Sequence, residues 1–329
     1  MTQPLLKVTD LKTQFRTKWG LVKAVDGVSF HVKHGETFGI VGESGSGKSV
    51  TSLSIMRLIP QPAGRIVSGA IELDGLNLLE LSEKEMRDYR GGKIGMILQD
   101  PLSSLNPLFT IGSQIIEGLR IHTSLKGRSL KERAIDLLRR VHIPSPAMRM
   151  KDWPHLLSGG MRQRVVGAIS ISCEPELLIA DEPTTALDAT IQLQYLNLLK
   201  RIQKETRLSI IFVTHDLGAV AYLCHRAAVM YAGRIVETAT VKDLFDKPAH
   251  PYTIGLLNSM QKVEKKADHI ESIKGQPPNL KNLPIGCSFA PRCDQVKDIC
   301  KEKYPEETEL GADHLVRCWV VKKEAVKIK

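Results

Sequence analysis

The sequence predicts an α/β fold in which a mostly parallel sheet is covered by helices. The chain has 329 residues, of which 42% are hydrophobic, which is enough for one large domain and a smaller addition. Short apolar runs at 36–41, 177–180 and 208–213 are typical of strands buried on both faces. Helical patterns at about 48–58 and 189–204 follow the first two runs, and such alternation favours a parallel sheet.

The remaining segments complete this outline. Residues 5–41 alternate apolar and polar positions and predict strands before the first helix. The stretch 82–172 interrupts the strand–helix alternation and reads as a helical insertion, with helices expected to start at capping boxes on Ser82 and Ser129. From about residue 262 the composition becomes charged, then rich in proline, then rich in cysteine. We therefore place a boundary near residue 260.

Hydropathy argues against a membrane-spanning or secreted protein, whereas the net charge does not identify a ligand. No run reaches the roughly 18 apolar residues needed to span a bilayer, and the N-terminus shows no secretory signal pattern. We expect a cytosolic protein that reaches a membrane only through partners. The net charge of +10 suits an acidic ligand or nucleic acid, but the basic residues are scattered, as on an ordinary solvated surface.

The first chemical motif follows the strand predicted at 36–41. Residues 42–49 fit the pattern G-x-x-x-x-G-K-[ST], in which glycines let backbone N–H groups face phosphates. Lys48 would add a positive charge at the β- and γ-phosphates, and Ser49 would offer its hydroxyl to Mg²⁺. Because a buried strand precedes the loop and a helix follows it, a chance glycine-rich turn is disfavoured.

The second motif is an acidic pair at the end of the strand predicted at 177–180. Ligands of parallel α/β sheets bind at the carboxyl ends of strands, where Asp181 and Glu182 lie. We expect Asp181 to hold Mg²⁺ and Glu182 to orient and polarise the attacking water. Together with the phosphate loop, the pair predicts a P-loop nucleoside triphosphatase.

A third motif narrows the class. The run Leu157-Ser158-Gly159-Gly160-Met161, followed by Arg162-Gln163-Arg164, resembles the signature of ABC ATPases. In that family the helix opened by the serine presents its positive end to the γ-phosphate of a nucleotide held by the partner subunit. The resemblance implies that Ser158, Gly159, Gly160 and Gln163 contact the partner's ATP.

Further residues match the same family. Gln99 resembles the Q-loop glutamine, which senses Mg²⁺ and water. The run Ala186-Leu187-Asp188 resembles the D-loop at the dimer interface. His215 resembles the switch histidine at the γ-phosphate. The adenine of this family usually stacks on an aromatic about twenty residues before the phosphate loop, where Trp19 lies, with Phe15 as the alternative. The implied nucleotide-binding residues are Trp19, Gly42, Glu43, Ser44, Gly45, Ser46, Gly47, Lys48, Ser49 and Val50.

Several segments are similar to the dipeptide/oligopeptide (and nickel) importer subfamily, and most of all to its D-type ATPases. They are Leu105-Asn106-Pro107, the run 179–188, His250-Pro251-Tyr252-Thr253, the run 275–280 and the run 287–293. The resemblance covers nearly the whole chain. No catalytic position departs from the family pattern, so we expect a subunit able to hydrolyse ATP.

The resemblance implies an architecture and a set of partners. We expect an ABC ATPase domain at 1–260 with a RecA-like core, an N-terminal antiparallel β-subdomain and a helical subdomain at about 100–172, followed by a cysteine-rich extension at 261–329. The expected partners are a second, homologous ATPase, two transmembrane permease subunits and an extracytoplasmic peptide-binding protein, at the cytoplasmic face of a bacterial membrane. Nucleic acid is not expected, since the sequence shows neither a coiled-coil insertion nor a second ATPase unit.

Four of the six cysteines lie in the tail with the spacing C-x₅-C-x₆-C-x₁₇-C: Cys287, Cys293, Cys300 and Cys318. The pattern lacks the C-x₂₋₄-C knuckle of structural zinc sites and suits a 4Fe–4S cluster at least as well, so zinc remains the alternative. Members of the resembled subfamily carry such a cluster. No cysteine falls inside a nucleotide motif, so we expect the cluster to hold the fold of the tail and to aid docking on a neighbouring subunit. Cys173 and Cys224 are expected in the core.

Overall fold

The computed structural model describes residues 3–100, 104–185, 187–260 and 273–321, which form two compact units. The first unit contains the described residues of 3–5, 32–37 and 77–213, and the second contains the described residues of 6–31, 38–76 and 214–321. No helix in the described ranges is long and apolar enough to cross a bilayer. The predicted boundary near 260 adjoins residues 261–272, which lie outside the described ranges, and it stays a prediction.

The first unit is built on three parallel strands. The strand β7 (Leu177–Asp181) pairs with β6 (Ile94–Ile97) on one side and with β8 (Ser209–Thr214) on the other. All positions of β7 and β8 are buried, which explains why their sequences are nearly continuous apolar runs. The strand β6 lies inside the stretch predicted as a helical insertion, and that prediction is wrong there because a four-residue apolar run is too short to distinguish strand from helix.

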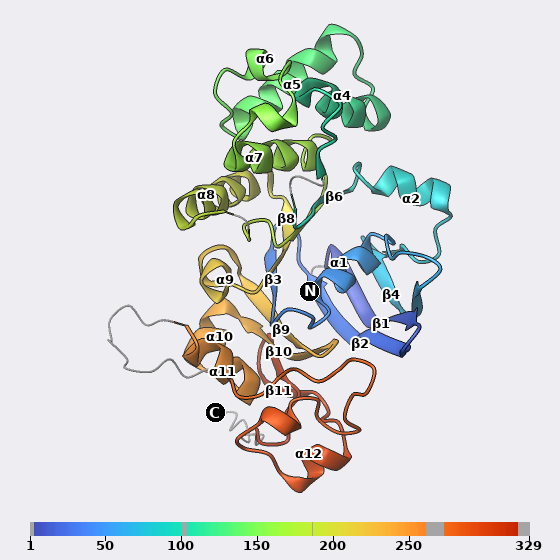
Figure 1. Cartoon of the computed structure of the whole chain (residues 1–329), viewed down its shortest axis with the longest axis vertical. Helices are drawn as coiled ribbons and strands as arrows, with labels where there is room; N and C mark the ends of the chain where they lie inside the picture. The colour runs from blue at the N-terminus through green and yellow to red at the C-terminus, as the bar shows by residue number, and fades with distance from the viewer. Residues whose placement is uncertain (1–2, 101–103, 186, 261–272, 322–329) are drawn as a thin grey trace. The chain divides into compact units, whose positions relative to one another are not determined.

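The helices of the first unit follow amphipathic patterns. In α5 the buried positions Leu130, Ala134, Leu137 and Leu138 share one face, against which α4 and α7 pack (Figure 1). The helical elements of this unit are α2 (Glu83–Tyr89), α4 (Ile111–His122), α5 (Arg128–Arg140), α6 (Pro146–Arg149), η1 (Pro154–Leu156), α7 (Gly159–Ser170) and α8 (Ala189–Thr206).

One of the two predicted capping boxes is present. Ser82 caps α2, and the Glu85 carboxylate accepts the main-chain N–H of Ser82 at 2.7 Å. The box predicted at Ser129 is wrong, because α5 already begins at Arg128 after Gly127. The hydroxyl of Ser129 instead donates to the carbonyl of Lys126 at 2.7 Å, within the turn before the helix.

The second unit combines a four-stranded sheet with a second set of strands. The first sheet has the order β2-β1-β4-β5, and β1 pairs antiparallel with β4 from Leu6 opposite Leu73 to Phe15 opposite Gly64. Alternating burial along β1 agrees with a sheet that has one covered face. The bounds are β1 (Leu6–Thr17), β2 (Gly20–Val32), β4 (Gly64–Leu73) and β5 (Leu76–Asn77). The predicted N-terminal antiparallel sheet is confirmed.

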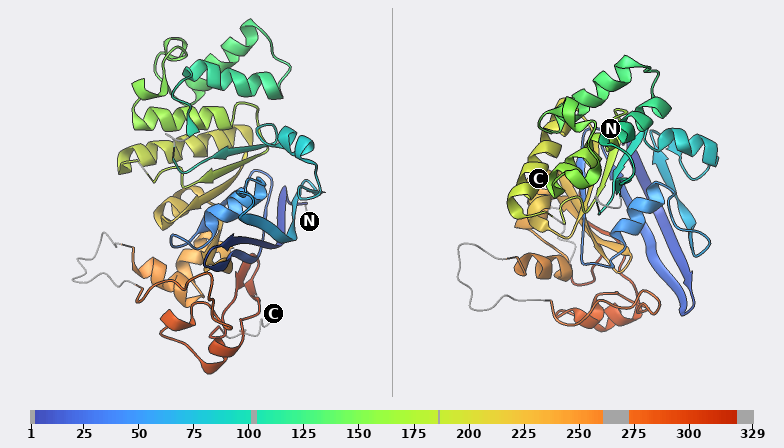
Figure 2. Two further views of the ribbon diagram at one scale, coloured as in Figure 1. Left: turned by 45° about the vertical axis from the view of Figure 1, so that its right-hand side comes forward. Right: turned by 45° about the horizontal axis from the view of Figure 1, so that its top comes forward.

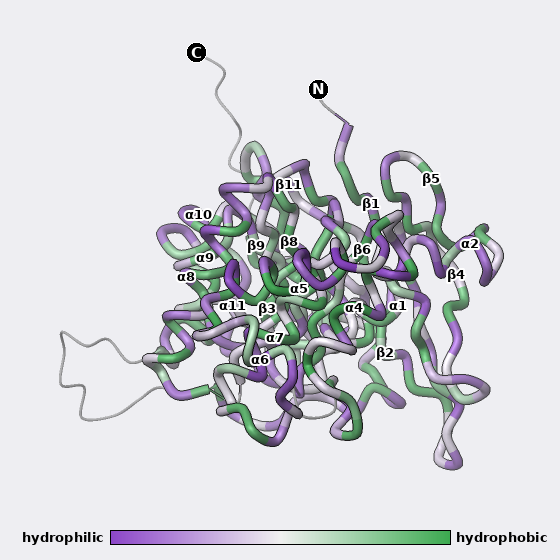
Figure 3. Tube along the Cα trace, turned by 90° about the horizontal axis from the view of Figure 1, so that it is seen from above, coloured by the Kyte–Doolittle hydropathy of each residue, from purple (hydrophilic) through white to green (hydrophobic). Residues whose placement is uncertain are grey.

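The other strands of this unit have the order β11-β12-β10-β9-β3, with β3 parallel to β9 and the remaining pairs antiparallel. All five positions of β3 are buried, and its apolar residues appear green in Figure 3. The elements are β3 (Thr37–Val41), α1 (Lys48–Ile55), α9 (Leu217–Leu223), β9 (Arg226–Tyr231), β10 (Arg234–Thr240), α10 (Val241–Asp246), α11 (Pro251–Asn258), η2 (Ala290–Arg292), α12 (Asp298–Glu302), β11 (Thr308–Gly311) and β12 (His314–Val316).

The core of the second unit joins its strands to the C-terminal segment. Val41 of β3 and Tyr231 of β9 belong to one buried cluster with Tyr252 of α11 and Phe289 of the tail. The three aromatic rings meet with centroids 4.6–5.4 Å apart. The strands β11 and β12, drawn in red in Figures 1 and 2, extend the same set of strands at its β10 edge. The tail therefore packs as part of the second unit.

Candidate functional site

The phosphate loop connects β3 to α1 in the second unit, as predicted. Two of its glycines are required by close backbone approach: a Cβ at Gly42 would lie 2.1 Å from the carbonyl oxygen of Met230, and one at Gly47 would lie 2.3 Å from that of Ala24. Gly47 also has φ 103°, in the left-handed region, and it directly precedes the first residue of α1. The loop thus curls tightly against the main chain and ends at a helix N-terminus.

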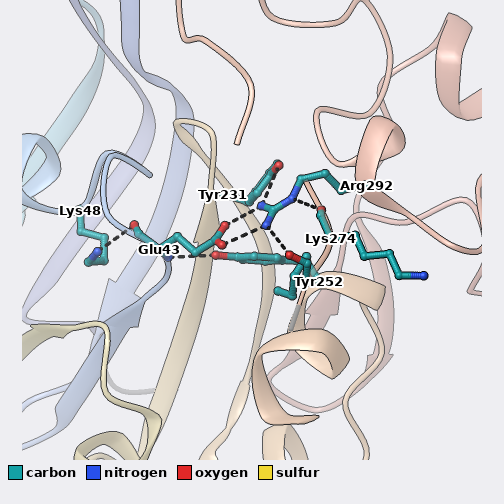
Figure 4. Close-up of polar contacts among 7 residues, drawn as sticks. Glu43, Lys48, Tyr231, Tyr252, Lys274 and Arg292 are labelled. Atoms are coloured by element: carbon teal, nitrogen blue, oxygen red, sulfur yellow. Dashed lines mark hydrogen bonds and ion pairs between the residues drawn. The ribbon is translucent and has the colours of Figure 1, made fainter. Parts of the chain in front are cut away.

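The loop carries a buried cation and a buried hydroxyl. Lys48 is 4% exposed, and its Nζ donates to the carbonyl oxygen of Gly42 at 2.8 Å. The same Nζ donates to the carbonyl oxygen of Glu43 at 3.1 Å (Figure 4). The hydroxyl of Ser46 is buried and has no hydrogen-bond partner in the described part of the chain. A curled backbone, a positive charge and an unpartnered hydroxyl at one helix end fit a phosphate group. Ser49 and Val50, in the first turn of α1, are half-buried.

The acidic pair lies at the carboxyl end of β7 in the first unit. Asp181 and Glu182 are 4% and 9% exposed. The Oε2 atom of Glu182 accepts hydrogen bonds from the side-chain amide of Gln99 at 3.2 Å and from the hydroxyl of Thr185 at 3.0 Å. Glu182 has φ 46°, an uncommon value for a residue with a side chain, and its main-chain N–H donates to Val213 at 2.8 Å.

Gln99 therefore contacts Glu182, although 83 residues separate them in the sequence. Gln99 follows β6, whose parallel pairing with β7 sets the ends of the two strands side by side. The sequence motifs identify both residues but do not predict a contact between them. Thr185, the second partner of Glu182, was missed because threonine after an acidic pair has no distinctive signal.

The signature residues and the D-loop aspartate meet at one cleft of 470 Å³ in the first unit. The hydroxyl of Ser158 caps α7 by accepting the N–H of Met161 at 3.3 Å. Asp188 caps α8 by accepting the N–H groups of Thr190 at 3.1 Å and Ile191 at 3.0 Å. The cleft is lined by His142, Pro144, Ser158, Gly159, Gly160, Met161, Arg164, Leu187, Asp188 and Ile191. Ala186 of the predicted D-loop lies outside the described residues.

Two neighbouring residues of the signature helix lie differently relative to this cleft, and the predicted contact of Gln163 with the partner's ATP stays a prediction. Gln163 is 1% exposed and does not line the cleft, because it faces inward from α7. Arg164, one position further, lines the cleft and is held by the side-chain oxygen of Gln194 at 2.9 Å and the carbonyl of His142 at 3.3 Å. Burial and the charges of Arg201 and Arg164 lower the pKa of His142. The cleft thus presents a cation beside the open N-terminus of α7.

The predicted switch histidine and the adenine-stacking aromatic belong to the second unit. His215 is exposed and directly follows β8, while Asp216 caps α9. Trp19 is 81% exposed at the turn between β1 and β2. Its competitor Phe15 is half-buried and lies against Gly64, its partner across the sheet. Trp19 is the more available ring, and its contact with adenine stays a prediction.

The four tail cysteines come close together. The N–H of Cys287 donates to the carbonyl of Cys300 at 2.7 Å, and Cys300 and Cys318 are buried. Burial, followed by the nearby Cys318 and Cys300 thiols, raises the pKa of Cys287 to about 11, and the same causes raise the pKa of Cys293. However, no group of three or more His, Cys, Asp or Glu side chains in the described ranges could hold a metal ion as it lies. The expected zinc or iron–sulfur site is therefore not supported by this arrangement. Cys173 and Cys224, expected in the core, are half-buried.

Comparison with known proteins agrees with this site. Residues 25–185 match the sequence profile of the family described as ABC transporter, and residues 236–300 match that of the oligopeptide/dipeptide transporter C-terminal region. The oligopeptide transport ATP-binding protein OppD of Bacillus subtilis is 51% identical over 99% of this chain and 91% of its own length. The chain belongs to the ABC transporter ATP-binding proteins.

A second relative and a solved structure are also similar to this chain. The dipeptide transport ATP-binding protein DppD of Bacillus subtilis is 48% identical over 97% of this chain and 95% of its own. A structure described as a dimeric, post-hydrolysis state of the ATP-binding cassette MJ0796 bound to ADP and Pi covers 72% of this chain and 98% of that chain. Its TM-score is 0.65 at 26% identity. The expected P-loop ABC ATPase fold is confirmed, and this ABC protein is an ATPase.

Proposed function

We propose that this ABC protein is the ATP-hydrolysing subunit of an importer for dipeptides or oligopeptides. The observation that carries the ATPase part is the phosphate loop: a curled backbone, a buried lysine and an unpartnered hydroxyl at the N-terminus of α1. The cargo class rests on the C-terminal region matched at 236–300 and on relatives named for oligopeptide and dipeptide transport. The chain acts from the cytoplasmic face of the membrane through its partners.

The site residues divide into binding and hydrolytic roles. Residues 42–50 bind the phosphates, with Lys48 on the β- and γ-phosphates, and Trp19 stacks on adenine. Ser49, Asp181 and Gln99 would hold Mg²⁺, which would supply neutralisation of the phosphate charge. Glu182 orients a water molecule whose oxygen attacks the γ-phosphorus and whose proton passes to the Glu182 carboxylate, while the bond to the bridging oxygen breaks and ADP leaves. His215 contacts the γ-phosphate.

The cleft formed by Ser158, Gly160 and Asp188 supplies the other half of a composite site. We infer that two ATPase subunits pair head to tail, so that the N-terminus of α7 and Arg164 face the γ-phosphate bound by the partner. The partner is a homologous, different ATPase. Closure of this dimer drives two permease subunits through the region after Gln99, and a peptide-binding protein delivers the cargo. We also propose that the ATPase domain ends near residue 260 and contains a helical subdomain at about 100–172.

Co-purification tests the importer. The tagged chain is extracted from membranes, its partners are identified, and the complex is placed in vesicles. We expect a permease pair and a second ATPase, with ATP hydrolysis stimulated by a peptide-loaded binding protein. A complex that lacks a permease, or hydrolysis that no peptide-loaded binding protein stimulates, would contradict the proposal.

We also propose that the four tail thiols bind a 4Fe–4S cluster. The support is the C-x₅-C-x₆-C-x₁₇-C spacing of these cysteines and the nearness of the Cys300 and Cys318 thiols to Cys287 and Cys293. Anaerobically purified protein should contain about four iron and four sulfide per chain. Stoichiometric zinc without iron would favour the alternative zinc site.

A further inference from the structure

The phosphate loop is bonded to the C-terminal tail through Glu43 and Arg292. The guanidinium of Arg292 forms a two-pronged ion pair with the Glu43 carboxylate, with Nη1 2.7 Å from Oε2 and Nη2 3.1 Å from Oε1 (Figure 4). The two residues are 249 positions apart. Such a fork is among the strongest and most directional side-chain pairs in proteins.

Arg292 is held in place from the tail side as well. Its Nε donates to the carbonyl of Lys274 at 2.9 Å, and its Nη1 lies 3.4 Å from the Tyr231 hydroxyl. The side chain is 4% exposed, and its guanidinium lies 5.9 Å from the ring centre of Tyr231. Arg292 therefore reaches Glu43 in a fixed direction, since its remaining donors are engaged by carbonyls of its own segment and by Tyr231 of β9.

A second contact holds the main chain of the same loop residue. The N–H of Glu43 donates to the hydroxyl of Tyr252 at 2.9 Å, and Tyr252 packs in the aromatic cluster of the second unit. The carbonyl of Glu43 accepts from Nζ of Lys48 at 3.1 Å. One residue thus connects the tail arginine, α11 and the lysine of the phosphate loop, as Figure 4 shows.

Glu43 carries a negative charge in a loop suited to bind anions. The pattern G-x-x-x-x-G-K-[ST] does not require an acid at this position. An unpaired carboxylate beside bound phosphates would repel them, and the repulsion would be stronger where water is excluded. Arg292 neutralises this carboxylate and directs it away from Lys48, toward the tail.

We propose that Arg292 is a positioning residue for ATP binding: it neutralises the Glu43 carboxylate and fixes the start of the phosphate loop, so that nucleotide affinity depends on the folded tail. This inference rests on the proposed binding of ATP phosphates by residues 42–50. It adds a residue outside every nucleotide motif to the requirements of the site.

The experiment measures ATP affinity by calorimetry on the purified full chain with Mg²⁺. Arg292→Met should raise Kd about tenfold, within the range of coupling between residues of one ion-pair network. Glu43→Gln in the Arg292→Met background should restore Kd to within about threefold of wild type, because the repelling charge is gone. The defect of Arg292→Met should also shrink at high salt. A residue needed only for stability would produce neither the rescue nor the salt dependence.

Two further variants serve as controls for Arg292→Met. Arg317→Met removes another tail arginine, which pairs with Glu307 at 3.3 Å, and should leave Kd unchanged. Arg292→Lys keeps the charge without the fork and should bind ATP within about threefold of wild type if Arg292→Met does not fold. Wild-type affinity in Arg292→Met, or no recovery in the double variant, would overturn the inference. If wild type bound ATP no better than Lys48→Ala, the proposed function itself would fail.

Discussion

The side-chain amide of Gln99 donates to Oε2 of Glu182 over 3.2 Å, which joins the ends of β6 and β7. The hydroxyl of Thr185 shares the same oxygen at 3.0 Å. Two neutral donors thus hold one oxygen of the Glu182 carboxylate, which fixes the orientation of this side chain.

Replacing Glu182 with glutamine should preserve ATP binding and slow hydrolysis. The amide keeps the size of the side chain but cannot polarise water as a carboxylate does, so we expect turnover to fall about 100- to 1,000-fold. The nucleotide-bound dimer should accumulate. Hydrolysis is measured with the cognate partner present, beside calorimetric ATP affinity. Turnover equal to wild type would remove Glu182 from its proposed role.

Replacing Lys48 with alanine should weaken ATP binding itself. The ammonium is buried within the loop and contacts two loop carbonyls, and its charge acts on the bound phosphates in the ground state. We expect Kd to rise about 10- to 100-fold, the range for lost hydrogen bonds to charged groups. Calorimetry with ATP provides the measurement. The prediction fails if affinity is unchanged while the variant remains folded.

Replacing Cys293 and Cys300 with serine should affect more than assembly. Arg292 directly precedes Cys293 in the sequence, so a tail that unfolds no longer presents its guanidinium to Glu43. We expect loss of bound iron, weaker co-purification of partners and a Kd for ATP raised about tenfold, as in Arg292→Met. Replacement of Cys173 and Cys224 is the control and should leave iron content intact. If the variant has an unfolded tail but binds ATP as well as wild type, ATP binding does not depend on the tail.

Acidification should destabilise the second unit through His250. This side chain is 1% exposed, its Nδ1 accepts the N–H of Tyr252 at 3.0 Å, and burial lowers its pKa to about 4. The unfolded chain binds a proton near pH 6.5, whereas the folded chain does so only near pH 4. The stabilisation is therefore complete above pH 6.5 and is lost as pH falls through this window, by up to about 3 kcal/mol.

A pair of histidine variants checks this pH dependence. His250→Asn keeps an acceptor at the start of α11 without a titrating ring, so it should flatten the fall in unfolding free energy between pH 6.5 and 4. His155→Asn changes an exposed histidine and should leave the fall as in wild type. Denaturant unfolding across this pH range provides the free energies. An identical slope in His250→Asn and wild type would show that another group is responsible.

Local chemistry determined the parts that the sequence predicted correctly. The strand-loop-helix around Lys48, the acidic pair after β7, and the caps Ser82 and Ser158 depend on residues within a few positions of one another. Spacing alone therefore identified them, and the family resemblance followed. The errors at Ser129 and β6 arose where two local patterns competed over only a few residues.

Only the tertiary structure decided which distant residues meet. The pairing of β6 with β7 brings Gln99 to Glu182, and the packing of the tail brings Arg292 to Glu43. The sequence alone suggested that the tail lay apart from the nucleotide motifs, because no cysteine falls within one. Contacts across 83 and 249 positions depend on how helices and strands pack, and periodicity carries no information about such pairings. The same packing turned Gln163 inward and left Arg164 at the cleft, since the face of α7 that is buried is fixed by its neighbours.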